Sequence, residues 1–154
     1  MGKESAGLLV YRVRAGELEF LLVHPGGPFW KNKDAGAWTI PKGEVQEGEA
    51  PIAAAKREFQ EELNLRVEGN PVELTPVKQK AGKLVTAWAM EKDFDLSQFE
   101  SNTFEMEWPP RSGQITSFPE VDKAAYFPMT EAKVKINPAQ IALLDELARI
   151  ARRA

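Results

Sequence analysis

The stretch that decides the fold, residues 43–65, reads GEVQEGEAPIAAAKREFQEELNL. Within it Glu58, Glu61 and Glu62 stand three and four residues apart, and such positions share one face of a helix. Like charges at this spacing weaken a helix by roughly 0.2–0.5 kcal/mol per pair, so helix stability does not explain them. Carboxylates gathered on one face are the oxygen ligands that Mg²⁺ prefers. The stretch therefore predicts a helix that holds a hard cation.

Apolar residues of the same stretch predict the face that packs on the core. They recur at helical spacing, at Ile52, Ala55, Phe59 and Leu63. Pro51 suits the first turn, where its missing N–H costs nothing, and Asn64 can take the left-handed conformation that ends a helix. The three carboxylates lie beside this apolar stripe, so we expect them at its border, neither buried in it nor opposite to it.

The spacing of charged residues in this stretch resembles the Nudix box. The matching residues are Gly43, Glu49, Arg57, Glu58, Glu61, Glu62 and Leu65. One position departs from the box, because Asn64 stands where Gly is usual, and Asn is the next-best residue for positive φ. The resemblance implies a single Nudix hydrolase domain over residues 1–154. Its expected fold is an α/β/α sandwich, with a mixed β-sheet between helices.

The resemblance also implies a reaction, the hydrolysis of a phosphoanhydride bond by attack of water on phosphorus. Three glutamates without His or Cys favour Mg²⁺ or Mn²⁺ over Zn²⁺ as the cofactor. The expected metal ligands are Glu58, Glu61, Glu62 and Gly43. Glu58 is also the first candidate for the catalytic base, and Arg57 is expected to orient the site. Spacing does not separate the base from the ligands.

Three residues around the helix are further candidates. Lys42 directly precedes the box and is expected to contact substrate phosphate, although a lone lysine is typically solvated. Glu49 is expected near the substrate and metals, or as a charge that complements the helix dipole. Glu120 resembles an additional catalytic Glu of Nudix members that cleave dinucleoside polyphosphates; the alternative is a solvated acid. Glu105 and Glu107 are weaker candidates for the same role.

The substrate is less well defined by the sequence. Residues 38–43, WTIPKG, resemble members that act on dinucleoside polyphosphates or diphosphoinositol phosphates, so we expect a small nucleoside or dinucleoside polyphosphate. An RNA 5′-end pyrophosphohydrolase and an ADP-ribose pyrophosphatase are alternatives. A non-hydrolysing nucleotide-binding regulatory module is an alternative of another class, which usually lacks box acids that are present here. Basic residues available for phosphate are Lys31, Lys33, Lys78, Lys80, Lys83 and Arg111.

Length and composition exclude several classes of protein. A chain of 154 residues fits one domain. A net charge of -3 argues against general nucleic-acid coating. The absence of cysteine excludes a disulfide scaffold and a thiolate zinc site. No apolar run approaches the ~20 residues of a membrane span, and no signal-peptide core is visible, so we expect a cytoplasmic enzyme.

Hydrophobic patterning predicts strands on both sides of the acidic helix. The expected strands are 5–13, 18–24, a short one at 38–41, fragments at 65–68 and 72–77, then 83–90 and 121–127. A short helix or turn is expected at 130–135, and a final helix begins after Asn137. His24, the sole histidine, is expected to end a strand rather than bind metal. The order predicts helices on both faces of a mixed sheet.

Two segments remain open to alternative readings. The loop 25–37 carries Phe29 and Trp30, which either fold onto the core or form one wall of a base-stacking pocket. Residues 91–118 show little periodicity, and we expect an ordered loop on the substrate side. A floppy excursion is the alternative for this segment.

Overall fold

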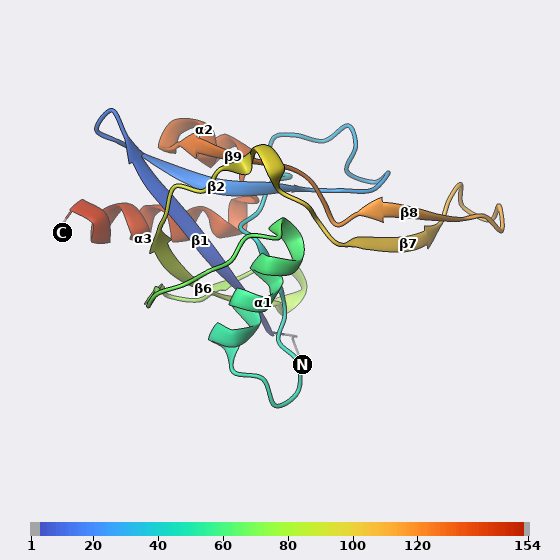
Figure 1. Cartoon of the computed structure of the whole chain (residues 1–154), viewed down its shortest axis with the longest axis horizontal. Coiled ribbons are helices and arrows are strands. Elements are labelled where there is room, and N and C mark those ends of the chain that lie inside the picture. Colours follow the sequence, from blue (N-terminus) through green and yellow to red (C-terminus); the bar gives the residue numbers. More distant parts are fainter. Residues whose placement is uncertain (1–3, 153–154) are drawn as a thin grey trace.

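A mixed β-sheet forms the middle of the computed structural model, which describes residues 4–152 (Figure 1). The ends of the predicted domain, 1–3 and 153–154, lie outside the described residues. The strands are β1 (Glu4–Arg14), β2 (Glu17–Pro25), β3 (Lys42–Glu44), β4 (Val72–Glu73), β5 (Val77–Lys78), β6 (Leu84–Glu91), β7 (Thr103–Glu107), β8 (Ile115–Pro119) and β9 (Val121–Pro128). The helices are α1 (Pro51–Leu63), α2 (Met129–Lys135) and α3 (Ile141–Arg152), with short 3₁₀ turns η1 (Lys80–Gly82), η2 (Leu96–Gln98) and η3 (Pro138–Gln140).

Strand β1 is the centre of the seven-stranded sheet, whose main order is β4-β6-β1-β2-β9. It pairs in parallel with β6 and antiparallel with β2, while its first residues also pair antiparallel with β3. The β1–β2 turn uses Ala15 and Gly16, both at positive φ, which matches the twist of a two-residue hairpin. Parallel and antiparallel pairs in one sheet confirm the predicted mixed sheet.

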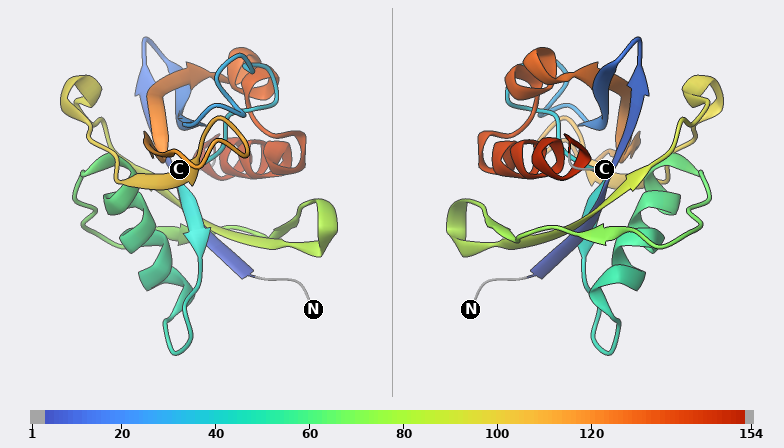
Figure 2. Two further views of the ribbon diagram at one scale, coloured as in Figure 1. Left: turned by 90° about the vertical axis from the view of Figure 1, so that its right-hand side faces the viewer. Right: turned by 90° about the vertical axis from the view of Figure 1, so that its left-hand side faces the viewer.

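Both faces of the sheet are covered, and β1 alternates between two cores. Leu8 and Val10 pack on the side of α1, whereas Leu9 packs on the side of α2 and α3. This period-2 alternation is expected of a strand that is buried on both faces. Figure 2 shows α1 on one side of the sheet and α2 and α3 on the other. The predicted α/β/α layering is therefore confirmed.

The acidic helix begins and ends where the sequence predicts. Pro51 occupies the first turn of α1, and Asn64 follows the last turn with φ 54° and ψ 36°, which is the left-handed conformation. Ala55, Phe59 and Leu63 are buried against the sheet. The residues at its ends and the spacing of its apolar residues predict the same helix, so one face of α1 packs on the core.

Two predicted strands are wrong. Residues 38–41 form no strand; Trp38 and Thr39 make isolated bridges, and the strand lies one step later, at β3. The backbone N–H of Ile40 donates instead to the Gln140 side chain, at 3.0 Å, so a side chain replaces the missing strand partner. Residues 65–68 pack on the core beside α1 without pairing to a neighbouring strand.

The segment 91–118 is ordered, as expected, but it is not a loop. It contains η2 and then a two-stranded sheet of β7 and β8, which projects from the body as an arm (Figure 1). The half-buried residues Phe104 and Met106 alternate with exposed acids along β7, which is the strand pattern that the sequence analysis overlooked. We call this two-stranded segment, residues 103–119, the arm.

Phe29 and Trp30 do not fold onto the core. Phe29 is 62% exposed and Trp30 is 39% exposed, so the first of the two alternatives for this loop is wrong.

Within residues 4–152, every helix falls short of the length and apolar content that a membrane crossing requires.

Candidate active site

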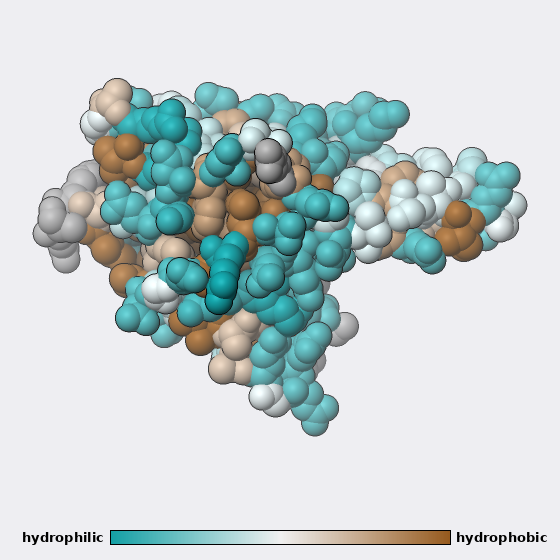
Figure 3. Space-filling view, viewed as in Figure 1, coloured by the Kyte–Doolittle hydropathy of each residue, from teal (hydrophilic) through white to brown (hydrophobic). Residues whose placement is uncertain are grey.

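Three carboxylates project from one side of α1, but they differ in burial. The Glu62 residue is 7% exposed, whereas the side chains of Glu58 and Glu61 are 15% and 38% exposed. The surface around α1 is mainly hydrophilic in Figure 3. The expectation that all three lie at the border of the apolar stripe is wrong for Glu62. It follows Phe59 by three residues, so helical spacing turns it toward the sheet.

Arg57 connects four acceptors and fixes the mouth of the site. Its guanidinium donates to both carboxylate oxygens of Glu49, at 2.8 and 3.0 Å, and to Oε1 of Glu58, at 2.8 Å. It also donates to the backbone carbonyl of Glu44, at 3.1 Å, and more weakly to Glu61, at 3.3 Å. The hydrogen bonds to Glu49 are the largest cause of the raised pKa of Arg57. This fork holds the loop before α1 against the helix.

Glu49 is fully engaged by this contact. Besides Arg57, its carboxylate accepts from the backbone N–H of Gln46, at 3.1 Å. Hydrogen bonds from Arg57 are also the first cause of its lowered pKa. In this geometry the Glu49 carboxylate orients Arg57. The expected contact of Glu49 with the substrate stays a prediction.

Glu62 is buried with one oxygen unsatisfied. Its Oε2 is buried and has no hydrogen-bond partner among the described residues. Burial raises the pKa of Glu62 well above its ordinary value, and the negative charges of Glu58 and Glu120 raise it further. The Lys42 backbone N–H donates to the Glu62 carboxylate and the Lys42 charge acts in the opposite direction, but neither satisfies Oε2. A buried carboxylate oxygen without a partner is costly unless something absent from the polypeptide neutralises it.

Gly43 approaches Glu58 so closely that no side chain fits between them. A Cβ at Gly43 would lie 2.0 Å from Cδ of Glu58 and 2.1 Å from its Oε2. Strand β3 thus runs directly against the carboxylate of Glu58. The partial burial of Glu58 is the first cause of its raised pKa.

Lys42 brings a positive charge to the same place from the edge of β3. Its pKa is lowered, first by burial and then by the nearby charge of Lys83, while Glu62 and Glu58 act in the opposite direction. Lys42 therefore lies within electrostatic reach of two of the acids. The sequence does not distinguish Lys83 from other surface cations, because its position near Lys42 depends on the pairing of β6 with β1.

Glu120, which lies about 60 residues after α1 in the sequence, interacts with the acids of that helix. The pKa of Glu120 is raised by partial burial and by the charges of Glu58 and Glu61. Its backbone is held on both sides, since its N–H donates to Asn102, at 2.8 Å, and its carbonyl accepts from Gly26, at 3.0 Å. The structure therefore brings together Glu58, Glu61, Glu62 and Glu120.

The weaker candidates for that position, Glu105 and Glu107, lie on the arm. The carboxylate of Glu107 accepts from the backbone N–H groups of Arg111 and Gly113, at 2.8 and 3.2 Å, and so closes the tip of the arm. No charge interaction links Glu105 or Glu107 with the acids of α1 in the part of the chain that the structure describes.

The residues present fit a divalent cation. The donor set is entirely oxygen, Oε2 of Glu62 lacks a partner, and the negative charge of Glu58 raises the pKa values of both Glu62 and Glu120. Among residues 4–152, no three acids already stand as a complete ligand set, because Arg57 draws Glu58 and Glu61 toward itself. Side-chain rotation at these two glutamates would complete the set, since hard cations accept flexible oxygen ligands.

The fold and this site define an α/β protein in which one helix gathers carboxylates against the edge of a mixed sheet. The chain belongs to the NUDIX domain family, whose sequence profile matches residues 3–147.

Several known proteins are similar to this chain. The asymmetrical bis(5′-nucleosyl)-tetraphosphatase of Caenorhabditis elegans is 43% identical over 65 residues, which cover 42% of this chain and 43% of that protein. The match therefore spans less than half of that relative. The Sus scrofa protein of the same name is 32% identical over 109 residues, covering 62% of this chain and 70% of that one. The crystal structure of C. elegans Ap4A hydrolase superposes with a TM-score of 0.63 at 26% identity, covering 98% of this chain and 99% of that one.

Proposed function

We propose that this chain is a Mg²⁺- or Mn²⁺-dependent hydrolase that cleaves a phosphoanhydride bond of a dinucleoside polyphosphate. The observation that carries the proposal is the unsatisfied buried oxygen of Glu62 among three further carboxylates. The names of the C. elegans and pig relatives support this substrate class. The single domain, the metal ligands and the residue roles that follow are parts of the same proposal.

The proposed reaction transfers a phosphoryl group to water. The oxygen of water forms a bond to phosphorus, the bridging P–O bond breaks, and the leaving phosphate departs with the bonding electron pair. A divalent cation, when bound, would neutralise phosphate oxygens and lower the pKa of the attacking water. The proton of that water passes to a carboxylate, for which Glu58 is the first candidate and Glu120 the second. Both have a raised pKa, which makes each carboxylate a stronger proton acceptor than an ordinary glutamate.

The remaining residues bind and orient. Glu58, Glu61 and Glu62, with the backbone of Gly43, are the proposed metal ligands. Lys42 is the proposed phosphate contact, because its positive charge interacts with the negative charges of Glu58 and Glu62. Arg57 acts as a positioning residue, since its five-donor fork sets the orientation of Glu49 and Glu58.

The alternatives are distinguishable by the ligand that they require. An RNA 5′-end pyrophosphohydrolase needs a basic track for the RNA backbone, and the net charge of -3 does not favour one. An ADP-ribose pyrophosphatase would cleave a diphosphate between two riboses. A regulatory module would bind a nucleotide without turnover, although every acid of the box is present here.

A substrate panel with product identification tests the proposal. Diadenosine tetraphosphate, adenosine 5′-tetraphosphate, ADP-ribose and a triphosphorylated RNA oligomer are each incubated with Mg²⁺ or Mn²⁺, and with EDTA as the control. We expect diadenosine tetraphosphate to give AMP and ATP, and EDTA to abolish cleavage. Nucleotide-induced thermal stabilisation without cleavage of any compound would instead identify a binding module.

A further inference from the structure

A second cavity lies directly behind the catalytic candidate Glu120. It has a volume of about 530 Å³ and lies between the loop 25–37 and the base and tip of the arm. The residues that matter here are Lys31, Asn32, Trp108, Phe118, Pro119 and Asp122. This volume is in the range of sites that enclose a small molecule of nucleoside size.

One short segment contributes residues both to the cavity and to the acidic site. Pro119 and Asp122 line the cavity, and Glu120, between them in sequence, faces the acids of α1. The backbone N–H of Gly26 donates to the carbonyl of Glu120, at 3.0 Å, so the loop 25–37 is attached at the same point. The cavity and the acidic site are therefore neighbours at the segment 119–122.

Trp108 gives the cavity an aromatic surface with a free face. Phe29 meets the Trp108 ring at 78° with centroids 5.7 Å apart, so the two rings are not stacked. An edge-to-face pair leaves at least one face of the indole uncovered by the phenylalanine. Phe118 packs on Phe104 at 6.0 Å and fixes the adjacent wall. Such a face is suited to stacking on a nucleobase, whichever base it is.

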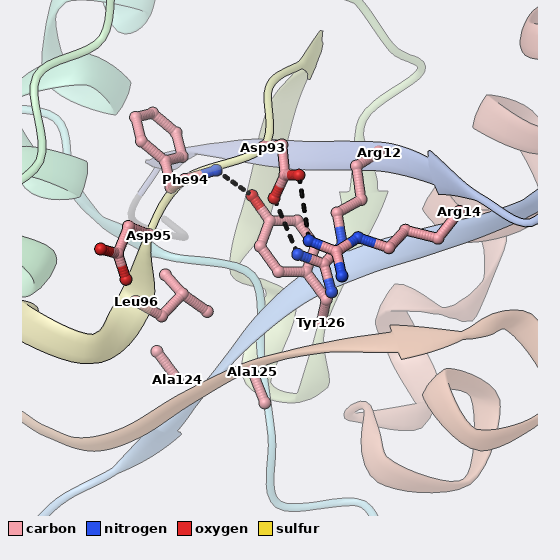
Figure 4. A pocket seen from close by; sticks show the side chains of 9 residues that line it. All are labelled: Arg12, Arg14, Asp93, Phe94, Asp95, Leu96, Ala124, Ala125 and Tyr126. Atoms are coloured by element: carbon pink, nitrogen blue, oxygen red, sulfur yellow. Dashed lines mark hydrogen bonds and ion pairs between the residues drawn. The ribbon is translucent and has the colours of Figure 1, made fainter.

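Another cavity of similar volume, shown in Figure 4, lacks this property. There the guanidinium of Arg12 already lies 3.9 Å from the centre of the Tyr126 ring. The Tyr126 hydroxyl donates to Lys92 and accepts from the N–H of Phe94, and Asp93 pairs with Arg12. Its aromatic face and its cation are both engaged, so it offers little to a nucleotide.

The loop 25–37 forms the polar side of the Trp108 cavity, and it is fixed to the sheet while two of its polar side chains stay free. The buried His24 ring bridges Asp122, at 2.7 Å, and the backbone carbonyl of Lys33, at 2.6 Å, and so ties the loop to β9. Lys31 and Asn32 are exposed on this loop. No ion pair engages the Lys31 ammonium among the residues that the structure describes. A free cation and a free amide therefore stand on a fixed support.

We propose that this cavity binds the second nucleoside of a dinucleoside polyphosphate, with its base against Trp108 and its nearest phosphate at Lys31. The inference rests on the proposed function and adds a specificity: the site is built for a substrate with a nucleoside at both ends. A mononucleoside polyphosphate would occupy the metal site and leave the cavity vacant.

The test compares two substrates that differ only in the second nucleoside. Diadenosine tetraphosphate and adenosine 5′-tetraphosphate are assayed with wild-type protein, Trp108→Ala and the matched control Trp30→Ala. Trp30 stands in the loop 25–37, has the Lys33 ammonium 5.2 Å from its ring centre and does not line the cavity. We expect Trp108→Ala to raise KM for diadenosine tetraphosphate about tenfold or more, and to leave KM for adenosine 5′-tetraphosphate unchanged. Trp30→Ala should leave both values unchanged. Equal effects of Trp108→Ala on both substrates, or none, would overturn the proposal.

Two further measurements keep the test decisive. Trp108→Phe retains an aromatic ring and is expected to give an intermediate KM if Trp108→Ala unfolds, while Lys31→Ala should raise KM for diadenosine tetraphosphate alone. Binding of AMP to metal-free protein, followed through the indole N–H signal of Trp108 by NMR, does not depend on turnover. AMP binding without hydrolysis of any substrate supports the nucleoside cavity and refutes the proposed function. Hydrolysis that the Trp108 and Lys31 variants leave unchanged supports the proposed function and refutes the nucleoside cavity. If AMP does not bind and no substrate is hydrolysed, both proposals are refuted.

Discussion

The acidic face of α1 takes its side chains from one helix, residues 57–62, whereas the Trp108 cavity joins the loop 25–37 to the arm. On α1 a single helical register brings Glu58 and Glu62 together, so their proximity follows from local structure. In the cavity, Lys31 and Trp108 line one space only because β2 pairs with β9 and the arm lies against the loop 25–37 through Phe29 and Trp108. In the proposed function, the acids of α1 that serve every substrate are placed by local structure, whereas the contacts proposed to distinguish substrates are placed by tertiary structure.

The largest expected effect is at Glu58. Glu58→Gln should lower kcat about 10²–10⁴-fold, because it removes a charged ligand and the first candidate for the base. If α1 serves the chemistry alone, the loss is equal for diadenosine tetraphosphate and adenosine 5′-tetraphosphate in steady-state kinetics. Glu73→Gln, an exposed acid on β4, is the control. Wild-type turnover in Glu58→Gln would remove this residue from the catalytic machinery.

A smaller loss is expected at Arg57. Arg57→Lys keeps the charge but cannot form the fork to Glu49, so we expect a 10- to 100-fold decrease in kcat/KM, about the effect of losing an orienting partner. Arg66→Lys, an exposed arginine paired with Glu68 at 3.4 Å, is the matched control. The measurement is the Mg²⁺ concentration dependence of the rate. An unchanged dependence would show that Arg57 does not orient the ligands.

The pH dependence of stability should expose the strain at Glu62. A carboxyl whose pKa is raised in the folded state binds more protons folded than unfolded, so its folded state loses stability as pH rises above the unfolded value. Glu58, Glu62 and Glu120 all have raised pKa values. The lowered pKa values of Glu49 and Asp93 act in the opposite direction, but below that window. Metal-free protein should therefore melt at a lower temperature near pH 8 than near pH 5.

Glu62→Gln should flatten this dependence of stability on pH. Removing the buried charge is expected to raise Tm at pH 8 in EDTA by about 2–4 °C, which corresponds to ~1 kcal/mol in a domain of this size. Calorimetry at both pH values, with Glu73→Gln as the control, measures the change. A Tm that falls equally with pH in Glu62→Gln and in wild type would show that Glu62 is not the strained group.

The smallest effect is expected at the tip of the arm. Glu107→Gln weakens the two hydrogen bonds that close the tip, and exposed bonds of this kind contribute about 1 kcal/mol or less. Tm should fall by at most ~4 °C. Hydrolysis of adenosine 5′-tetraphosphate should be unchanged, since the arm lies outside the acidic site. A large loss of that activity would show that the arm contributes to the acidic site of α1 as well as to the Trp108 cavity.

Local signals predicted part of this protein well. The bounds of α1 followed from Pro51 and Asn64, and β1 and β9 followed from apolar runs. Local signals failed where a segment depends on distant partners. Residues 38–41 form no strand, because the backbone N–H of Ile40 donates to the Gln140 side chain. The strands of the arm were not predicted, because the prolines and aromatic residues of 91–118 obscure the alternation of half-buried and exposed residues along β7.

The sequence by itself determined the acidic helix, the family and the oxygen-ligand chemistry, because residues three and four apart on a helix meet whatever the rest of the chain does. Tertiary structure alone decided that Glu62 is buried with an unsatisfied oxygen, that Glu120 joins the acids, and that Trp108 opens onto a cavity. Burial and charge coupling depend on which strands pair. That choice is made by the whole sheet, so no short stretch of sequence encodes it.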